Sequence, residues 1–248
     1  MRVINQPNRS RSYFAPVGMV AGLVLVAALC LPAIDRGGAS RRSQCKNNLK
    51  QIGLALHNYH DEFGCFPPAF IADANGRPMH SWRVLLLPYL DQAPLYVQYR
   101  FDEPWDGPNN RKLADKILPI FNCPSEVHGD GKSAATMTSY VAVVGPETAW
   151  PGNTATSIRD IKDGTSNTLL IVEVANSRIH WMEPRDLHVV QMAPTINAKF
   201  GQGISSLHTG GAHALLADGS VRFISEQTTA ELIRALLTVH GKEKIGDF

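Results

Sequence analysis

Residues 14–34 read FAPVGMVAGLVLVAALCLPAI and contain no charged side chain, and residues 43–63 read SQCKNNLKQIGLALHNYHDEF. These two segments decide the fold, because the first is uniformly apolar and the second has the periodicity of an amphipathic helix. About 20 apolar residues, at 1.5 Å of rise per residue, cross the roughly 30 Å hydrocarbon core of a bilayer. Residues 14–34 therefore predict a transmembrane helix that anchors the chain near its N-terminus.

Other interpretations of the apolar segment compete with an uncleaved anchor. A cleavable signal peptide has an apolar region of roughly 7–15 residues and small residues before the cut. Here the region is longer, and the best cut site, after Ala33, is preceded by Leu31 and Pro32. A lipoprotein site needs a small residue before its cysteine, whereas Leu29 precedes Cys30. A buried core helix is a further alternative, and we expect the anchor.

Basic residues are concentrated beside the apolar segment. Residues 1–42 hold six of the 24 basic residues and one of the 22 acidic ones, so residues 43–248 carry 18 basic residues against 21 acidic ones. Because basic residues flank the span on both sides, the charge rule for loops does not fix its orientation. The remainder has no basic stripe of the kind that binds a phosphate backbone, so we expect no nucleic-acid partner.

The amphipathic segment predicts a helix that ends at Phe63. Its apolar residues recur at spacings of three and four, which places them in one stripe along the helix. The stripe consists of Leu49, Ile52, Leu56, Tyr59 and Phe63. Ser40 or Ser43 is placed to cap the start of this helix, and Gly64 to end it. We expect the stripe to pack against a sheet.

The rest of the chain predicts hairpins with short helices inserted between them. One hairpin joins residues 70–72 to 78–82 through Asn75-Gly76, and a late one joins 212–217 to 220–224 through Asp218-Gly219. Further strands are predicted at 119–123, 139–144 and 168–174, and short helices at 82–90, 95–101 and 109–117. A long helix followed by strands in hairpins predicts an α+β fold rather than alternating βαβ units.

Two details of the C-terminal region follow from its residues. A two-residue turn in the late hairpin would pair Leu216 with Val221 and Ala214 with Phe223. Thr228 and Glu231 have the spacing of a capping box before a final amphipathic helix.

The predicted segments are a polar arm (1–13), a transmembrane helix (14–34), a basic joint (35–42), a globular α+β domain (43–240) and a polar tail (241–248).

Several short motifs along the chain, taken together, resemble those of a known protein family. In order they are SQCKNNLKQIG (43–53), HNYH (57–60), FPP (66–68), HSWR (80–83), LPY (87–89), FNCPS (121–125), DGTSNT (163–168) with Glu173, and Trp181 with Pro184 and Asp186-Leu187. His208 then stands nine residues before Asp218-Gly219, which is similar to an H-X9-DG signature. Together the motifs resemble the DUF1559 family of pilin-like, type II secretion protein G-related bacterial surface proteins. The resemblance implies that the family-motif residues are Trp82, Cys123, Asn167, Glu173, His208, Asp218 and Gly219.

The resemblance implies a pilin-like layout for the chain. An N-terminal helix would lie in the inner (cytoplasmic) membrane with its first half, and an antiparallel α+β head would pack against its second half outside the cytoplasm. The family implies no established activity and no cofactor. Its members usually begin with a Gly-Phe-Thr-Leu-Ile-Glu leader, whereas residues 11–16 here read RSYFAP and Asp35 is the first acidic residue. Processing of the N-terminus and filament formation therefore stay open.

Two groups of side chains have the residue types of a metal site. His57, His60 and Asp61 fall within one helical turn but lack the i, i+4 histidines and the glutamate of a zinc-protease helix. The second group surrounds Pro184 in a predicted loop and consists of His180, Glu183, Asp186 and His188. Core or surface packing explains both groups, so we expect no metal.

His208 and Asp218 would make an acid–base pair if the late hairpin brought them together. The turn alone explains Asp218, and a histidine that fixes the loop before a hairpin is the simpler interpretation. The sequence contains no nucleophile elbow, phosphate loop or HExxH motif. We therefore expect a protein that is not an enzyme.

Three cysteines lie outside the predicted span. On a continuous helix Cys45 and Cys65 would be separated by roughly 30 Å, which is too far for a disulfide. In an oxidising compartment a Cys65–Cys123 disulfide is one possibility, and three unpaired, buried cysteines are another.

Two functions remain possible. In both, residues 14–34 attach the chain to the membrane. One is a structural or assembly protein, a pilin-like or pseudopilin-like subunit that meets components of a secretion or pilus-like system. The other is an anchored binding module that captures a ligand or partner through the loops around Trp105, Trp150 and Trp181. An exposed groove lined by aromatic residues would favour binding, and a flat polar head would favour assembly.

Overall fold

The computed structural model describes residues 33–126, 134–198, 200–243 and 245–246. The predicted arm at 1–13 and residues 14–32 of the predicted span lie outside this part of the chain. Within the described residues, no helix combines the length and the apolar character that a membrane span requires. The chain divides into the units Met1–Gly37 and Gly38–Phe248, and the description below concerns the second.

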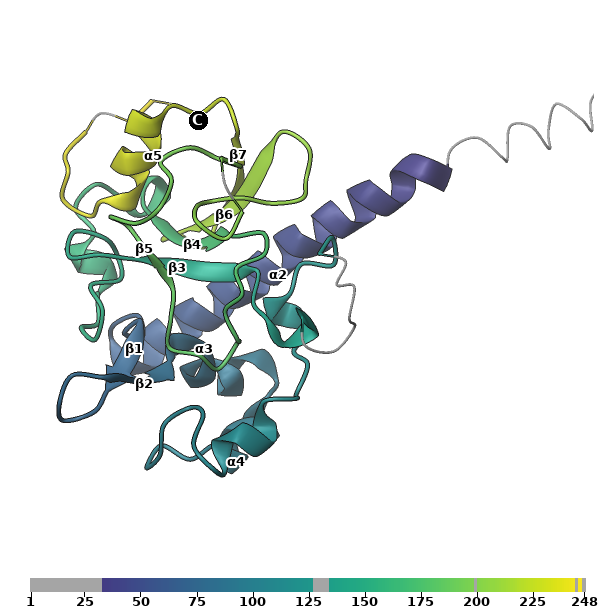
Figure 1. The fold of residues 1–248 in the computed structure, drawn as a ribbon. Helices are drawn as coiled ribbons and strands as arrows, with labels where there is room; N and C mark the ends of the chain where they lie inside the picture. Colours follow the sequence, from purple (N-terminus) through teal and green to yellow (C-terminus); the bar gives the residue numbers. More distant parts are fainter. Residues whose placement is uncertain (1–32, 127–133, 199, 244, 247–248) are drawn as a thin grey trace, which may run out of the picture. The chain divides into compact units, whose positions relative to one another are not determined.

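Figure 1 shows the helices and strands in chain order. The longer elements are α2 (Ala33–Phe63), β1 (Phe70–Ala72), β2 (Pro78–Ser81), α3 (Trp82–Leu85), α4 (Ala93–Gln98), β3 (Tyr140–Val144), β4 (Leu169–Glu173), β5 (Leu187–His188), β6 (Gly211–Leu216), β7 (Val221–Ser225) and α5 (Ala230–Leu237). Short 3-10 helices join them: η1 (Leu87–Leu90), η2 (Asn110–Leu113), η3 (Pro119–Phe121), η4 (Ala134–Thr136), η5 (Ile158–Asp160) and η6 (Thr165–Asn167).

Helix α2 confirms the predicted stripe over most of its length. Leu49, Ile52 and Leu56 are completely buried, whereas Phe63 at the end of the helix is 55% exposed. The helix ends as expected at Gly64, whose positive φ of 74° suits the C-terminal stop position. Its start differs from the prediction. Because α2 is already helical from Ala33, the basic joint at 35–42 is helical, and neither Ser40 nor Ser43 caps the start of this helix.

Five strands form the main sheet, in the order β5-β3-β4-β6-β7. All neighbours are antiparallel except β3 and β5, which run parallel, so the sheet is mixed and not antiparallel throughout as predicted. The difference arises because the chain leaves β4 and returns along the far side of β3, adding a two-residue edge strand that carries no strong strand signal in the sequence.

The two faces of this sheet contribute to different hydrophobic clusters. Tyr140, Ile171 and Leu215 join the buried residues of α2 in one cluster. Val141 and Val172, from neighbouring positions, join a second cluster that includes the buried residues of α5. The sheet therefore lies between α2 and α5, with hydrophobic side chains on both faces, and this arrangement confirms the expected α+β class.

The late hairpin has a different register from the predicted one. Leu215 is paired with Val221, and His213 with Phe223, a shift of one residue. The cause is Gly219, whose φ of 82° adds a left-handed residue to the turn, as in three-residue hairpin loops with a bulge. Phe223 consequently lies opposite His213, with ring centroids 5.0 Å apart, instead of opposite Ala214.

Other local predictions have mixed outcomes. The β1–β2 hairpin is present, but its loop is built by Asp73, whose carboxylate accepts hydrogen bonds from the N–H groups of Asn75 and Arg77. The predicted strand at 119–123 is instead η3, where Pro119 begins a 3-10 turn. The cap of α5 is Thr229, which accepts a hydrogen bond from the Leu232 N–H, so the Thr228 prediction was wrong by one residue.

Candidate functional site

Glu173, the last residue of β4, carries a carboxylate that is almost completely buried. The neighbouring strand β6 supplies His213, whose backbone N–H donates a hydrogen bond of 2.6 Å to Oε2. The Nδ1 atom of the same histidine lies 3.1 Å from Oε2. These two contacts from one residue fix the orientation of the carboxylate.

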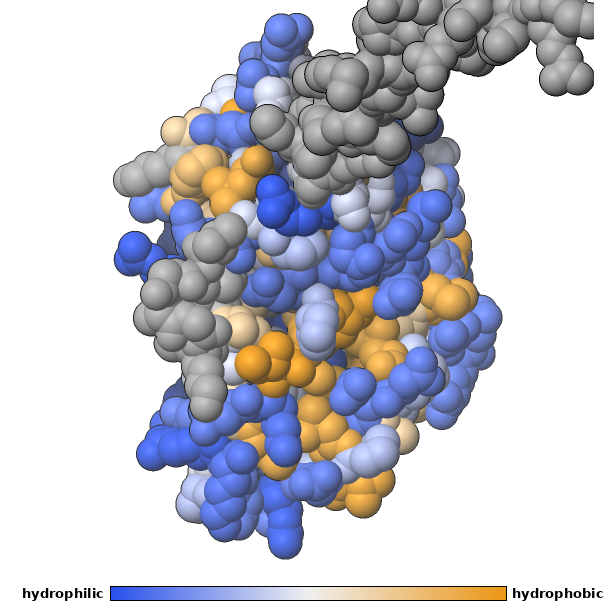
Figure 2. Space-filling view, turned by 90° about the vertical axis from the view of Figure 1, so that its right-hand side faces the viewer, coloured by the Kyte–Doolittle hydropathy of each residue, from blue (hydrophilic) through white to orange (hydrophobic). Residues whose placement is uncertain are grey.

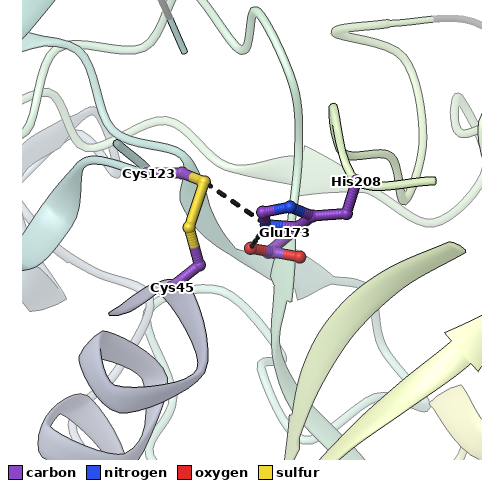
Figure 3. A group of neighbouring side chains, drawn as sticks. All are labelled: Cys45, Cys123, Glu173 and His208. Atoms are coloured by element: carbon purple, nitrogen blue, oxygen red, sulfur yellow. Dashed lines mark hydrogen bonds and ion pairs between the residues drawn. A yellow bond between two sulfur atoms is a disulfide. The ribbon is translucent and has the colours of Figure 1, made fainter. Parts of the chain in front are cut away.

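His208 approaches the other oxygen of this carboxylate from the loop that precedes β6. Ser206 shapes the loop, because its hydroxyl accepts from the His208 N–H at 3.0 Å and donates to the Gly211 carbonyl at 2.6 Å. The His208 Nε2 atom then lies 3.5 Å from Glu173 Oε1 and 3.6 Å from Cys123 Sγ, as Figure 3 shows. One imidazole nitrogen therefore faces both a carboxylate and a sulfur.

The sulfur belongs to a disulfide between Cys45 of α2 and Cys123, with a Cα–Cα distance of 5.3 Å. The Cys65–Cys123 pairing considered above is thus wrong, and Cys65 is a half-buried free thiol in the described part of the chain. The physical reason is position on α2. Cys45 lies four residues before Leu49, on the buried face of the helix, whereas Cys65 follows the end of the helix. Figure 3 shows Cys45 reaching from the helix toward Cys123.

Burial and charge act in opposite directions on the acids of this cluster. Burial alone would raise the pKa of Glu173, but the interactions with His208 and His213 outweigh it and leave that pKa below its usual value. Glu126 accepts a hydrogen bond from the Asn176 N–H at 3.2 Å. Burial is the main cause that raises the pKa of Glu126 to about 7, and the nearby charge of Glu173 adds to the effect.

The ligand atoms of Cys45, Cys123, Glu173 and His208 all lie within 4.8 Å of one another. Cysteine sulfur, imidazole nitrogen and carboxylate oxygen are each donor atoms that zinc takes in proteins. As long as the sulfurs are bonded to each other, they are not thiolate ligands. The cluster was missed at the sequence level because Cys45 was considered only as a partner for Cys65. The spacing of Cys45 from the apolar stripe was the available signal.

The H-X9-DG motif has two separate roles in the structure. His208 belongs to the buried cluster, while Asp218 is exposed in the β6–β7 turn, where its carboxylate accepts a hydrogen bond of 2.8 Å from the Ser220 N–H. The two residues do not form the acid–base pair considered above. Gly219 follows in the same turn, and a Cβ atom there would lie 3.3 Å from the His57 ring. The turn therefore sits close against α2.

The other motif residues stabilise loops and core. Asn167 donates from its side chain to the Asp163 carbonyl at 3.1 Å, in the loop before β4. Trp82 is completely buried, and its indole N–H donates to the carboxylate of Asp186 at 3.2 Å. In the described part of the chain, neither side chain forms a hydrogen bond with the disulfide cluster.

A second buried ionic cluster surrounds Asp186. Arg83 Nη2 lies 2.5 Å from Asp186 Oδ1, and the side chains are 0% and 2% exposed. The Ala142 N–H donates to the same oxygen at 2.8 Å, and the Arg83 guanidinium also donates to the Tyr140 carbonyl. Burial raises the pKa of Asp186 and lowers the pKa of Arg83, and the mutual attraction of the pair opposes both shifts.

The two metal candidates from the sequence are not assembled. Glu183 pairs with Arg185, and His180 Nε2 lies 3.0 Å from the Ala114 carbonyl. On α2, His60 Nε2 accepts from the Ile158 N–H at 3.3 Å. The group with metal-ligand spacing found among the described residues is the disulfide cluster instead.

The tryptophans proposed to line a binding groove are largely internal. Trp150 and Trp181 are each 1% exposed. Trp105 is half-buried and stacks on His180, with ring centroids 5.7 Å apart. The face in Figure 2 is mostly hydrophilic, with hydrophobic patches between the hydrophilic residues. Trp150 and Trp181 therefore belong to the core and do not form an exposed surface.

These features define a class of protein: a long helix joined by a buried disulfide to a mixed sheet, with a histidine–glutamate pair beside the sulfurs. A family model described as "Protein of unknown function (DUF1559)" matches residues 38–186 and 178–231. The chain belongs to the DUF1559 family. Searches of curated proteins and of solved structures find no match.

Proposed function

We propose that this chain is a non-enzymatic, membrane-anchored, pilin-like surface protein with a structural or assembly role. Residues 14–34 would hold it in the inner membrane, and the domain from residue 43 would lie outside the cytoplasm. The observation that carries the proposal is α2, which follows the apolar segment directly and buries one face against a sheet while leaving Leu54 63% exposed on another. A helix used in this way is available for packing against neighbouring subunits.

The disulfide supports the proposed location. Disulfides persist in oxidising compartments and are rare in the reducing cytosol. The Cys45–Cys123 bond joins α2 to the segment before β3, so the proposed anchor helix and the head would be linked covalently outside the membrane. The disulfide would give the head a second covalent link to its anchor, in addition to the backbone.

The alternative, an anchored binding module, has less support, because two of the three tryptophans expected around its binding surface are buried. Trp150 and Trp181 are core residues. The pocket beside β5 is lined by Ser177, Arg185, His188 and aliphatic or polar neighbours, and its described lining has no Phe, Tyr or Trp. Assembly is therefore the function we favour.

The proposal is tested first on the full chain extracted from membranes without reductant. We expect an N-terminus at Met1 or Arg2, resistance to extraction by alkaline carbonate, and a Cys45–Cys123 peptide in the mass map. A start within residues 12–16 would show that a leader peptidase acts on this chain and would favour filament assembly. A start near Ile34 would refute the permanent anchor.

A photo-crosslinking residue then distinguishes assembly from capture of a partner. We would place it at Leu54 on α2, with Val190 as the matched control, because these side chains are 63% and 78% exposed on different elements. The proposal expects adducts at Leu54 with a second copy of the chain or with other membrane-anchored subunits, and fewer at Val190. Adducts at both sites with one soluble partner would favour the binding module instead.

A further inference from the structure

The buried cluster contains more polar groups than a disulfide requires. A disulfide that links two segments needs only its two cysteines, but this one is accompanied by the buried side chains of His208 and Glu173. Burying a carboxylate costs free energy unless its oxygens are paired. Within the described residues, Glu173 Oε1 lacks a hydrogen-bond partner although solvent does not reach it. This oxygen makes a long ion-pair contact of 3.5 Å with His208 Nε2 and faces two sulfurs, so it retains capacity for a further ligand.

We propose that, when the disulfide is reduced, Cys45, Cys123, His208 and Glu173 bind one zinc ion. The four ligands come from α2, the segment after η3, the loop before β6 and the end of β4. Their donor atoms are within 4.8 Å of one another, and bonds of about 2.0–2.3 Å in a tetrahedral site place ligand atoms about 3.3–3.8 Å apart. Movements of about 1 Å therefore suffice once the sulfurs separate.

The surroundings of the cluster already orient the ligands. His213 holds Glu173 Oε2 through its N–H and its Nδ1 atom, which leaves Oε1 directed toward the sulfurs. The Cys123 N–H donates to the Ser139 hydroxyl at 2.8 Å and fixes the backbone of that ligand. Hydrogen bonds of this kind, made by groups behind the ligands, commonly change metal affinity by about 10–100-fold.

Opening the site requires a reductant for the Cys45–Cys123 disulfide, and a dithiol can serve. Exchange with the dithiol breaks the Cys45–Cys123 bond, oxidises the reductant to its own disulfide and leaves two protein thiols. Zinc then displaces a proton from each thiol, so two protons are released for each ion bound. Because the same sulfurs cannot be in a disulfide and on zinc at once, oxidation must expel the metal. The site would thus alternate between a covalent link and a metal link between α2 and the head.

The test uses the full chain in detergent, with Cys65→Ser to remove the other described thiol. After reduction with a phosphine in the absence of oxygen, Co²⁺ and then Zn²⁺ are added. We expect one metal per chain, the charge-transfer absorption of thiolate-bound Co²⁺, release of two protons, and protection of Cys45 and Cys123 from alkylation. The oxidised protein should bind neither ion at this site.

Variants distinguish this site from capture by two thiols alone. His208→Gln and Glu173→Gln should each weaken Zn²⁺ binding by at least about 10-fold in competition with a chelator. The matched control, His188→Gln, should leave it unchanged. Equal affinities in all of these proteins would overturn the proposal, as would a reduced wild-type chain that takes up no metal.

Folding of the reduced chain is followed in the same samples by circular dichroism. If reduction unfolds the head and zinc restores it, metal binding and folding are coupled, as in structural zinc sites. If the reduced head takes up no zinc, the site does not exist, whether the head stays folded or unfolds. The outcome is independent of the proposed assembly function, because no membrane or partner takes part.

Discussion

The two buried ionic clusters differ in how completely their polar atoms are paired. Asp186 accepts hydrogen bonds on both oxygens, from Arg83, the Trp82 indole and the Ala142 N–H. Glu173 accepts from His213 on one oxygen, while its other oxygen has contacts with His208 at 3.5 Å but no hydrogen bond in the described structure. The first cluster is therefore a structural network, whereas the second retains unused ligand capacity.

Loss of the Arg83 charge should have the largest effect. Arg83→Met would leave Asp186 buried without its partner, and breaking a buried ion pair in this way costs about 3–5 kcal/mol. The control is Arg77→Met, because Arg77 pairs with Asp73 at the surface, where its side chain is 77% exposed. Exposed pairs contribute about 0–1 kcal/mol. Urea unfolding of both variants measures the difference, and equal losses would mean that the Arg83 network is not structural.

Removal of the disulfide should follow in size. The bond closes a loop over a sequence separation of 78 residues, for which loop-closure entropy predicts about 4 kcal/mol of stabilisation. The double variant Cys45→Ala/Cys123→Ala should lose about this free energy of unfolding, while Cys65→Ala should change it little. A comparable loss from Cys65→Ala would show that Cys65 takes part in the native disulfide.

The third prediction concerns pH. The pKa of Glu126 is about 7 in the folded chain and near the ordinary value of 4.5 when unfolded. Between these values the folded state keeps a proton that the unfolded state releases, so the free energy of unfolding falls as pH rises from about 4.5 to 7 and is level above. The expected fall in the free energy of unfolding is about 3 kcal/mol. Glu126→Gln should remove it, and an identical pH profile in the variant would contradict the assignment.

The smallest effect tests the comparison most directly. Glu173→Gln keeps an oxygen for His213 and puts an NH₂ group at Oε1, where the contact with His208 Nε2 is long, at 3.5 Å, so we expect a loss of about 1 kcal/mol. Asp186→Asn is the matched variant, and it should lose several times more because its NH₂ group must face Arg83, Trp82 or the Ala142 N–H. Thermal unfolding of the pair decides the point. Equal losses would mean that both clusters are structural.

Local patterns predicted the fold class and most of its elements. The α2 stripe, the strands at 139–144 and 168–174 and the late hairpin are all present, because apolar periodicity reports which side of an element is buried. The register of that hairpin was wrong by one residue, since the left-handed conformation at Gly219 is not determined by the dipeptide Asp218-Gly219 alone. The segment 119–123 was also wrong, because a short apolar run does not separate a strand from a 3-10 turn.

The candidate site was predictable only in part. Glu173, His208 and Cys123 were singled out as motif residues, yet nothing in their spacing shows that they meet. Glu173 is next to His213 because β4 and β6 are neighbours in the sheet, and strand order is a property of the tertiary fold. His208 was considered with Asp218, which is near it in sequence, and that pair was set aside in favour of a histidine that fixes the loop. Cys45 was missed although it continues the α2 stripe by four residues.

The length of α2 also decides which cysteines meet during folding. In an unstructured chain Cys45 would encounter Cys65 roughly eight times more often than Cys123, because contact probability falls with about the −3/2 power of loop length. Once the intervening residues are helical, these two sulfurs are held roughly 30 Å apart and only the distant partner is within reach. Helix formation before oxidation therefore selects the native disulfide. Oxidation of a chain whose helix has not yet formed would trap a kinetic isomer that a disulfide isomerase must undo.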